Sequence, residues 1–501
     1  MGVMFYRKDL NVSNKKSKNY AKTKVIEGFI DGSKFLLDST GSYNTYNFCY
    51  NNGALETGLG IGTLKMPNGN SDMNYVQNEL NYPEGISFKS GLYHTEYNEQ
   101  ANKYNKYFIC YGSDNRFYDY VPYTGIRTFY CANSRTFTEQ PILMQMKING
   151  KDYLLMSNKS DGLFLYNNGQ FEKQVSGINI TSMCVHDGRL YATLGGDCRS
   201  FRYSTDLDPT NWNSLLDTDG EIIMDDQRGI LNKVLSFKGA VYVFREFGIT
   251  KVTVNKNGEA EVNHMFLSGS RIYADTVCVC GDKIFMMLRD GVYVFNGTTV
   301  EKLDLPIAKL WLNTFNSCAC AVFFNGKYYL ASRLDFNDQR LFKDEMNSLR
   351  KGNTCLIEID VNTYEINVLR GVEAVFMFPF EDGEVQKLVI GRKVNNVVNL
   401  WQLEKSGLWG TTPTTKSWQS AYTDFGYPCK LKTLRRIQLY TKNDITLEVE
   451  SERGKFSYAI KGNEKYVQDI PINRKGKNFA LTITATTAEA YISNPKIVFE
   501  V

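Results

Sequence analysis

Three histidines are the only imidazole groups available for acid–base or metal chemistry: His94, His186 and His264. None of them has a partner at the spacing of a metal-binding motif or a catalytic triad, so an active site built on histidine is not expected. His186 comes directly before a turn sequence, where an imidazole serves as a hydrogen-bonding turn residue. We therefore predict that the chain has no catalytic residue and is not an enzyme.

Two cysteine pairs have the residue types of a zinc site. Cys278 and Cys280 lie two positions apart, as do Cys318 and Cys320, so each pair shares one face of a strand. When the hairpin turns that follow are aligned, Cys278 falls opposite Val322 and the pairs are offset by about 13 Å at the usual strand rise. Zinc requires its sulfur ligands within about 4 Å of each other. We therefore predict no metal and no cofactor.

Two further strings resemble known site motifs. Residues 58–62, Gly-Leu-Gly-Ile-Gly, have the glycines of a phosphate-binding loop but lack the flanking strand and helix, which favours a glycine-rich turn. Residues 204–212 are similar to the Asp-box turn of sialidase-type propellers, with Asp208 at a glycine position and one extra residue before Trp212. An Asp box is itself a structural turn. A glycosidase would also need two convergent carboxylates, and the sequence does not show which of its 54 acidic residues converge.

Composition indicates a folded chain rich in β structure. Of the 501 residues, 43% are hydrophobic and 22% are charged, and 32 tyrosines and 30 phenylalanines accompany short runs of Val, Ile and Thr. The formal net charge of +4 is small for this length and provides no electrostatic basis for nucleic-acid affinity. The local basic group is interpreted as a solvated arm; its members are Lys15, Lys16, Lys18, Lys22 and Lys24.

No segment of the chain has the features of a targeting or membrane-spanning segment. The first residues lack the apolar run of a signal peptide, Tyr6 stands where a myristoylation motif has Ser or Thr, and no stretch approaches eighteen apolar residues. The eleven cysteines are odd in number and scattered through apolar strands, as expected for buried free thiols made in a reducing cytosol. We expect a chain without a membrane span.

A short apolar strand, a polar turn with glycine and an aromatic strand recur along the chain. The turns are Asn149-Gly150, Asp187-Gly188, Lys238-Gly239, Gly281-Asp282 and Asn325-Gly326. Asn-Gly and Asp-Gly accept the positive φ of tight turns, so each copy predicts a β-hairpin. The glycines are separated by 38, 51, 42 and 45 residues, the period of four-stranded propeller blades. A second turn signal within each interval, such as Asn168-Gly169, supplies the other hairpin.

Weaker copies at residues 107–111 and 376–380 extend this repeat outward. We predict an all-β fold in which a β-propeller of about seven four-stranded blades spans residues 84–412, preceded by an N-terminal arm and opening strands over 1–83. A closed ring is favoured over one open sheet because radial stacking leaves only short edges. The polar stretch 337–352, which has helical character, is predicted to be an insertion between strands of the sixth blade, on a rim where partners bind.

The pattern changes after the Gly/Thr/Pro-rich residues 407–416, which are interpreted as a linker. The next segments alternate apolar and polar residues with period two, which predicts an antiparallel β-sandwich over residues 413–501. Its expected strands are 436–440, 445–449, 456–460, 479–483 and 497–501.

Three segments resemble the propeller-containing tail and neck proteins of tailed bacteriophages, including nozzle and hub components. Residues 46–61, with an Asn-rich strand leading to a glycine turn, look like the opening segment of such chains. Residues 203–212 are similar to the Ser…Asp-Pro…Trp stretch that these proteins carry within a blade. Residues 418–437, with Trp418, the string Thr423-Asp424-Phe425-Gly426-Tyr427-Pro428, Lys430 and Lys432, look like the bridge from propeller to sandwich.

The resemblance implies a virion structural protein, located in the phage tail and made in the host cytoplasm, that acts through protein–protein contacts. It implies an oligomeric ring of six copies around the DNA exit channel, in contact with other tail, neck or portal-side proteins, and DNA passing without specific binding. The family brings no catalytic residues. Two alternatives remain: a tail-associated glycan-binding protein or propeller-type glycoside hydrolase, and a cellular propeller scaffold.

Overall fold

The turn residues adopt the backbone conformations that tight hairpins require. Asn149 and Gly150 have φ of 50° and 83°, and Asn325 and Gly326 have φ of 48° and 72°. Two successive residues with positive φ form the turn whose twist matches that of paired strands, so each of these sequences closes a hairpin locally.

The structure is a computed structural model. It describes residues 23–27, 45–51, 54–67, 77–98, 101–122, 128–131, 135–196, 198–212, 220–255, 259–305, 307–311, 316–335, 352–382, 385–420 and 422–501. Lys15, Lys16, Lys18 and Lys22 of the expected basic arm lie outside these residues. So does the expected insertion at 337–352, apart from its last residue.

The chain forms two compact units. The larger comprises Thr63–Tyr364 and Gly371–Gln402, and the smaller comprises Met1–Gly62, Glu365–Arg370 and Leu403–Val501. Nearly all regular elements in both are β-strands; among the described residues, the only helical turn is the 3₁₀ turn η1 (Ala308–Trp311).

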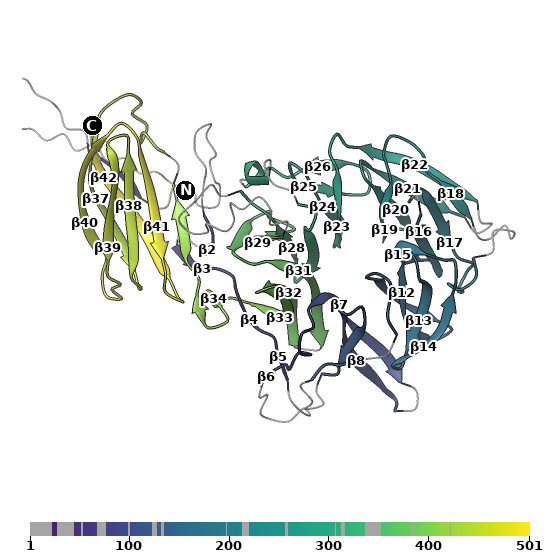
Figure 1. Cartoon of the computed structure of the whole chain (residues 1–501). Coiled ribbons are helices and arrows are strands. Elements are labelled where there is room, and N and C mark those ends of the chain that lie inside the picture. Colours follow the sequence, from purple (N-terminus) through teal and green to yellow (C-terminus); the bar gives the residue numbers. More distant parts are fainter. Residues whose placement is uncertain are drawn as a thin grey trace, which may run out of the picture. The chain divides into compact units, whose positions relative to one another are not determined.

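Seven consecutive antiparallel sheets make up the larger unit (Figure 1). The first four are β7 (Phe88–Asn98), β8 (Lys103–Gly112), β9 (Phe117–Tyr120) and β10 (Tyr130–Cys131); β11 (Ile142–Ile148), β12 (Lys151–Asn158), β13 (Gly162–Asn167) and β14 (Gln170–Val175); β15 (Ile180–His186), β16 (Arg189–Leu194), β17 (Ser200–Tyr203) and β18 (Glu221–Ile223); and β19 (Leu231–Phe237), β20 (Ala240–Arg245), β21 (Gly248–Val254) and β22 (Ala260–Leu267).

The remaining three sheets complete the series. They are β23 (Ile272–Cys280), β24 (Lys283–Leu288), β25 (Gly291–Phe295) and β26 (Val300–Lys302); β27 (Cys320–Phe324), β28 (Lys327–Ser332) and β29 (Cys355–Asp360); and β31 (Ala374–Asp382), β32 (Val385–Val394) and β33 (Val397–Glu404). Residues 336–351 fall between β28 and β29, which are both strands of the sixth sheet.

The seven sheets close into a ring. The first strands of successive sheets contact one another from β11 through β15, β19, β23 and β27 to β31, and β31 contacts β7 while β7 contacts β12. In Figure 1 the last sheet, in green, lies beside the first, in blue. The rings of Phe108 and Phe380 meet edge to face at 5.2 Å across this junction. The sheets are therefore the blades of a seven-bladed propeller, and the predicted fold class is confirmed.

The seventh blade also receives a segment from before the first blade. The amide of Leu64 donates to the carbonyl of Leu400 at 3.4 Å, and the amide of Lys65 donates to the side chain of Gln402 at 3.3 Å, both on β33. A strand from one end of the ring that adds to the blade at the other end fastens the circle without a free edge.

The smaller unit is a β-sandwich of two sheets. One contains β2 (Phe48–Asn51), β3 (Ala54–Thr57), β42 (Tyr491–Glu500), β37 (Lys432–Thr441) and β40 (Gln468–Gly476), with β1 (Thr23–Glu27) also paired to β42; the other contains β36 (Lys416–Gln419), β41 (Phe479–Ala485), β38 (Ile445–Ser451) and β39 (Gly454–Ile460). Alternate residues of β38, namely Ile445, Leu447 and Val449, are buried against the facing sheet. The predicted C-terminal sandwich is confirmed.

Two parts of the chain lie elsewhere than expected. Residues 48–57, expected among the strands that lead into the ring, form β2 and β3 of the sandwich. The expected linker contains a small hairpin of β34 (Leu408–Trp409) and β35 (Thr412–Pro413), which turns at Gly410 with φ of 61°. No helix in the described part of the chain is long and apolar enough to span a membrane.

Candidate functional site

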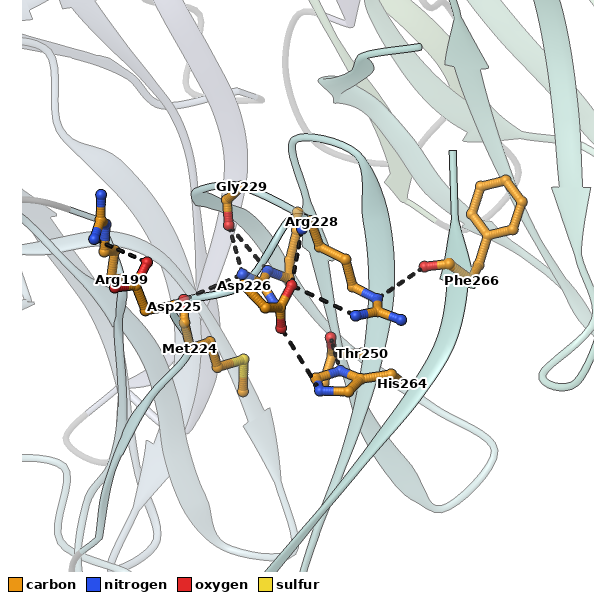
Figure 2. A network of polar contacts seen from close by, with 10 residues as sticks. Arg199, Met224, Asp225, Asp226, Arg228, Gly229, Thr250, His264 and Phe266 are labelled. Carbon is orange, nitrogen blue, oxygen red and sulfur yellow. Dashed lines mark hydrogen bonds and ion pairs between the residues drawn. The ribbon is translucent and has the colours of Figure 1, made fainter. Parts of the chain in front are cut away.

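A polar network lies where the third blade passes to the fourth (Figure 2). Arg245, at the end of β20, is fully buried, and its guanidinium contacts the Asp226 carboxylate at 2.6 Å. The same guanidinium donates to the carbonyls of Met224 (3.1 Å) and Gly229 (2.7 Å). A buried guanidinium needs such partners because an unpaired charge in the interior is very costly. We call Asp226, Arg228, Arg245, Thr250 and His264 the blade 3–4 network.

The network contains a hydroxyl, an imidazole and a carboxylate in sequence. Thr250 Oγ1 lies 3.2 Å from His264 Nδ1, and His264 Nε2 lies 3.6 Å from Asp226 Oδ2. Hydrolases use this order of groups to activate a nucleophilic hydroxyl. Thr250 is completely buried, however, so that no substrate carbonyl can approach its oxygen.

Asp226 is also engaged by two arginines. Burial raises the pKa of the Asp226 carboxyl, but the hydrogen bond from the Arg228 amide and the contact with the Arg245 guanidinium outweigh it and leave the pKa below its usual value. Its interaction with His264, at 3.6 Å, is beyond hydrogen-bonding distance. The arrangement holds two blades together and is not built to transfer a proton.

Sequence reasoning did not bring Thr250 and His264 together. They are register partners in the hairpin of β21 and β22, which turns between Val254 and Ala260. The pairing could have been found by counting from the turn in both directions, because the strands are antiparallel. Thr250 is four residues before Val254, and His264 is four residues after Ala260. The approach of Asp226 from the preceding blade has no comparable sequence signal.

A buried carboxylate lies between the first and second blades. Glu96 on β7 is 2% exposed and accepts a hydrogen bond from the amide of Asn168 at 2.9 Å, and fully buried His94 lies 3.6 Å from the same carboxylate oxygen. Burial raises the pKa of Tyr107, and the charges of Glu96 and Asp119 raise it further.

These two carboxylates have opposite pKa shifts, the pattern of a general acid paired with a carboxylate base. Burial raises the pKa of Asp119. Burial also raises that of Glu96, but the His94 imidazole and the Asn168 amide lower it more, so the net shift is downward. Glu96 lies inside the interface between blades, out of reach of a polysaccharide, so we assign it to packing of the first blade on the second.

The cysteine pairs lie on neighbouring blades, Cys278 and Cys280 on β23 and Cys320 on β27. The thiol of Cys280 donates to the carbonyl of Cys278 at 3.6 Å, and that of Cys320 donates to the carbonyl of Val375 at 3.5 Å. Burial raises the pKa of Cys320 to about 12, which keeps it a thiol. No three His, Cys, Asp or Glu side chains within the described ranges are grouped so as to hold a metal ion.

The remaining sequence candidates occupy structural positions. His186 Nδ1 pairs with Ser236 Oγ of the next blade at 2.9 Å. In the Asp-box-like turn, Asp208 accepts from the amide of Thr210 at 2.9 Å and the indole of Trp212 donates to the carbonyl of Pro209 at 2.6 Å. Gly58 is required by close packing, since a Cβ there would lie 2.8 Å from the carbonyl oxygen of Asn47.

A surface feature is better suited to function than any of these buried groups. β8 pairs with β7 from Lys103 to Gly112 but with β9 only from Phe108 to Tyr111, so the outer half of the β7–β8 hairpin is a two-stranded ribbon. Tyr97 and Tyr104 on this ribbon are 36% and 56% exposed, with ring centroids 5.3 Å apart.

The ribbon is attached to the blades on both sides. The amide of Tyr97 donates to Asp152 of the second blade at 2.9 Å, and the ammonium of Lys106 pairs with Asp382 of the seventh at 2.5 Å. These contacts reduce the conformational freedom that the ribbon would lose on binding a partner.

The fold and these surfaces define the chain as a seven-bladed propeller protein with a β-sandwich. No family model matches it, and no curated protein matches it in sequence. Similar solved structures include BamB from Moraxella catarrhalis, with 10% identity over 72% of this chain and 96% of that one and a TM-score of 0.36. Another is BBS1N in complex with ARL6DN, with 10% identity over 64% of this chain and 93% of that one and a TM-score of 0.43. A third is PorZ of Porphyromonas gingivalis, with 10% identity over 89% of this chain and 56% of that one and a TM-score of 0.36.

Proposed function

We propose that this chain is a structural protein of a bacteriophage tail or neck, of the nozzle or hub kind, that acts through protein–protein contacts. In this proposal several copies, six by the family resemblance, form a ring in the virion tail. Neighbouring tail, neck or portal-side proteins bind its rims, and DNA passes without being gripped. The net charge of +4 on 501 residues supports the last point, because strong phosphate binding requires a concentrated positive surface.

The observation that carries the proposal is the ribbon with Tyr97 and Tyr104. Tyrosine provides a large contact area at low entropic cost and is enriched where binding energy concentrates in protein interfaces. Because the ribbon is held by Asp152 and Asp382, it presents both rings in a fixed arrangement. A rigid, exposed aromatic pair suits the capture of another protein surface.

The segment that resembles the bridge of phage tail proteins supports the proposal in a second way. Several of its residues lie in the interior of the sandwich: Trp418 is 4% exposed, and Phe425 stacks on Phe499 at 4.5 Å. Fully buried Lys432 donates to the carbonyls of Tyr427, Lys430 and Lys477 at 2.6–2.8 Å. The resemblance therefore falls on residues that build the unit.

The test is self-association of the full chain and its dependence on the ribbon. We expect light scattering after size exclusion, with negative-stain microscopy, to give a ring, and Tyr97→Ser/Tyr104→Ser to weaken assembly or capture of a tail partner at least tenfold, about 1.4 kcal/mol. The control is Tyr466→Ser, a tyrosine 63% exposed on the sandwich, which should change association less than twofold.

The outcome that would contradict the proposal is a chain that remains monomeric at tens of micromolar and hydrolyses a bacterial surface polysaccharide. Turnover of that polysaccharide by the purified monomeric chain would establish the glycosidase alternative. Binding of the polysaccharide without turnover, abolished by the tyrosine double variant, would instead identify a glycan-binding protein.

A further inference from the structure

One edge of β42, the C-terminal strand of the sandwich, is paired along residues 496–500 by the short strand β1 alone. We call these residues the acceptor edge. β37 pairs with one side of β42 along almost its whole length, from Thr433 opposite Glu500 to Thr441 opposite Ile492. On the other side, β3 pairs only with residues 491–493 and β1 pairs with residues 496–500. Without β1, the half of β42 that carries the core residues Ile497 and Phe499 would be an open edge.

β1 is well suited to this edge. Its sequence Thr-Lys-Val-Ile-Glu contains β-branched residues, which favour strands, and all five positions are in register with β42. The register runs without a break from Thr23 opposite Glu500 to Glu27 opposite Lys496. Among the described elements, β1 pairs only with β42.

The covalent connection allows β1 to reach more than one sheet. Residues 28–44 separate β1 from Thr45, and Tyr46 is then held by backbone hydrogen bonds to Ser417. Seventeen residues can span about 56 Å when fully extended. Pairing within one chain must close this loop and therefore costs entropy. A neighbouring copy in a ring offers the same five backbone pairs at a high effective concentration, so exchange between copies loses no contact.

We propose that β1 is exchanged between copies: in the assembled protein, residues 23–27 of one copy pair with residues 496–500 of the next. Each copy gives one strand and accepts one strand, so a closed ring leaves no acceptor edge open. The inference rests on the proposed ring, and it names the element that links adjacent subunits. The partner is therefore a second copy of this chain.

The test uses the register partners Val25 and Val498. Full-length Val25→Cys and Val498→Cys chains with different affinity tags are co-expressed, oxidised with oxidised glutathione and analysed without reduction. We expect a covalent dimer carrying both tags, with a disulfide between positions 25 and 498 in the peptide mass spectrum. Lys24→Cys with Val498→Cys is the matched control; its side chain should lie on the opposite face, so the yield should fall at least tenfold.

Each single variant alone measures the background from the eleven native cysteines. In the Val25→Cys/Val498→Cys double variant, we expect the disulfide to join two chains. A disulfide that forms only within one chain, in a preparation that still assembles into a ring, would refute strand exchange. That result would leave the proposed function standing. A chain that forms no ring contradicts both.

Deletion of residues 1–27 is a second test that introduces no cysteine. We expect the truncated chain to dissociate at concentrations at least tenfold higher than the intact chain. Unchanged assembly of the truncated chain would refute strand exchange even if the cysteine variants failed to fold.

Discussion

At the scale of single residues, the polar groups that look most chemical hold blades together. Asp226 contacts buried Arg245 at 2.6 Å, whereas its neighbour Asp225 pairs with Arg199 at 2.8 Å between side chains that are 65% and 47% exposed. The two aspartates are adjacent in sequence, but the arginine that each one pairs with is buried in one case and exposed in the other. Removal of Asp226 leaves a buried guanidinium without its counter-ion.

We therefore predict that Asp226→Asn lowers the free energy of unfolding of the propeller by about 2 kcal/mol, less than for a fully buried pair because the carboxylate is 31% exposed. The matched control, Asp225→Asn, should change it by less than about 0.5 kcal/mol. Urea denaturation followed by fluorescence measures both. Equal effects of the two substitutions would contradict the assignment.

The same variant should change the pH dependence of stability. Because the pKa of Asp226 is lowered in the folded protein, its contribution is complete above the unfolded value of 3.8 and is lost as the pH falls through the lower folded value. Asp226→Asn should therefore flatten the acid limb of the stability profile. A profile that still falls as steeply as in the unsubstituted protein would show that other carboxylates dominate.

At the scale of elements, the blades depend on close approach between paired strands. Gly391 on β32 is opposite Phe376 on β31, and a Cβ at residue 391 would lie 2.3 Å from the Phe376 ring. Phe376 belongs to the core between the seventh and first blades, so the ring has little room to move.

Gly391→Ala is accordingly expected to destabilise the propeller by about 1–3 kcal/mol, the usual cost of overpacking. Gly269→Ala is the control, since a Cβ there meets nothing within 4 Å. Thermal unfolding monitored by circular dichroism compares the two. If the two variants melt together, the close packing at β32 does not constrain the ring.

At the scale of the molecule, the two units have separate hydrophobic cores. The sandwich core contains Leu447 and Phe479, and the ring-closing core contains Phe108 and Phe380. Each core is assembled from residues of one unit only. Units with their own cores behave as domains, which can unfold independently.

Calorimetry should therefore resolve two transitions. Phe108→Ala should lower only the propeller transition, at a cost of about 3–5 kcal/mol, and Leu447→Ala should lower only the sandwich transition, at about 2–5 kcal/mol. Each variant serves as the control for the other. A single transition shifted by both substitutions would mean that the units unfold together.

The repeated hairpins follow from local sequence, because a pair such as Asn149-Gly150 fixes a turn through its own backbone preferences. The spacing of these turns determined the propeller, and period-two alternation in residues 445–449 determined the sandwich. These are local signals, and each can be recognised without knowing which strands or blades pack against the segment.

Which groups on different sheets meet is a property of the folded molecule. Packing of neighbouring blades brings Asn168 to Glu96 and Asp226 to Arg245, and residues 54–56 pair with a strand more than 400 positions away. Such contacts depend on how the sheets pack on one another and on the order of their strands, so no residue type or spacing within either partner specifies them.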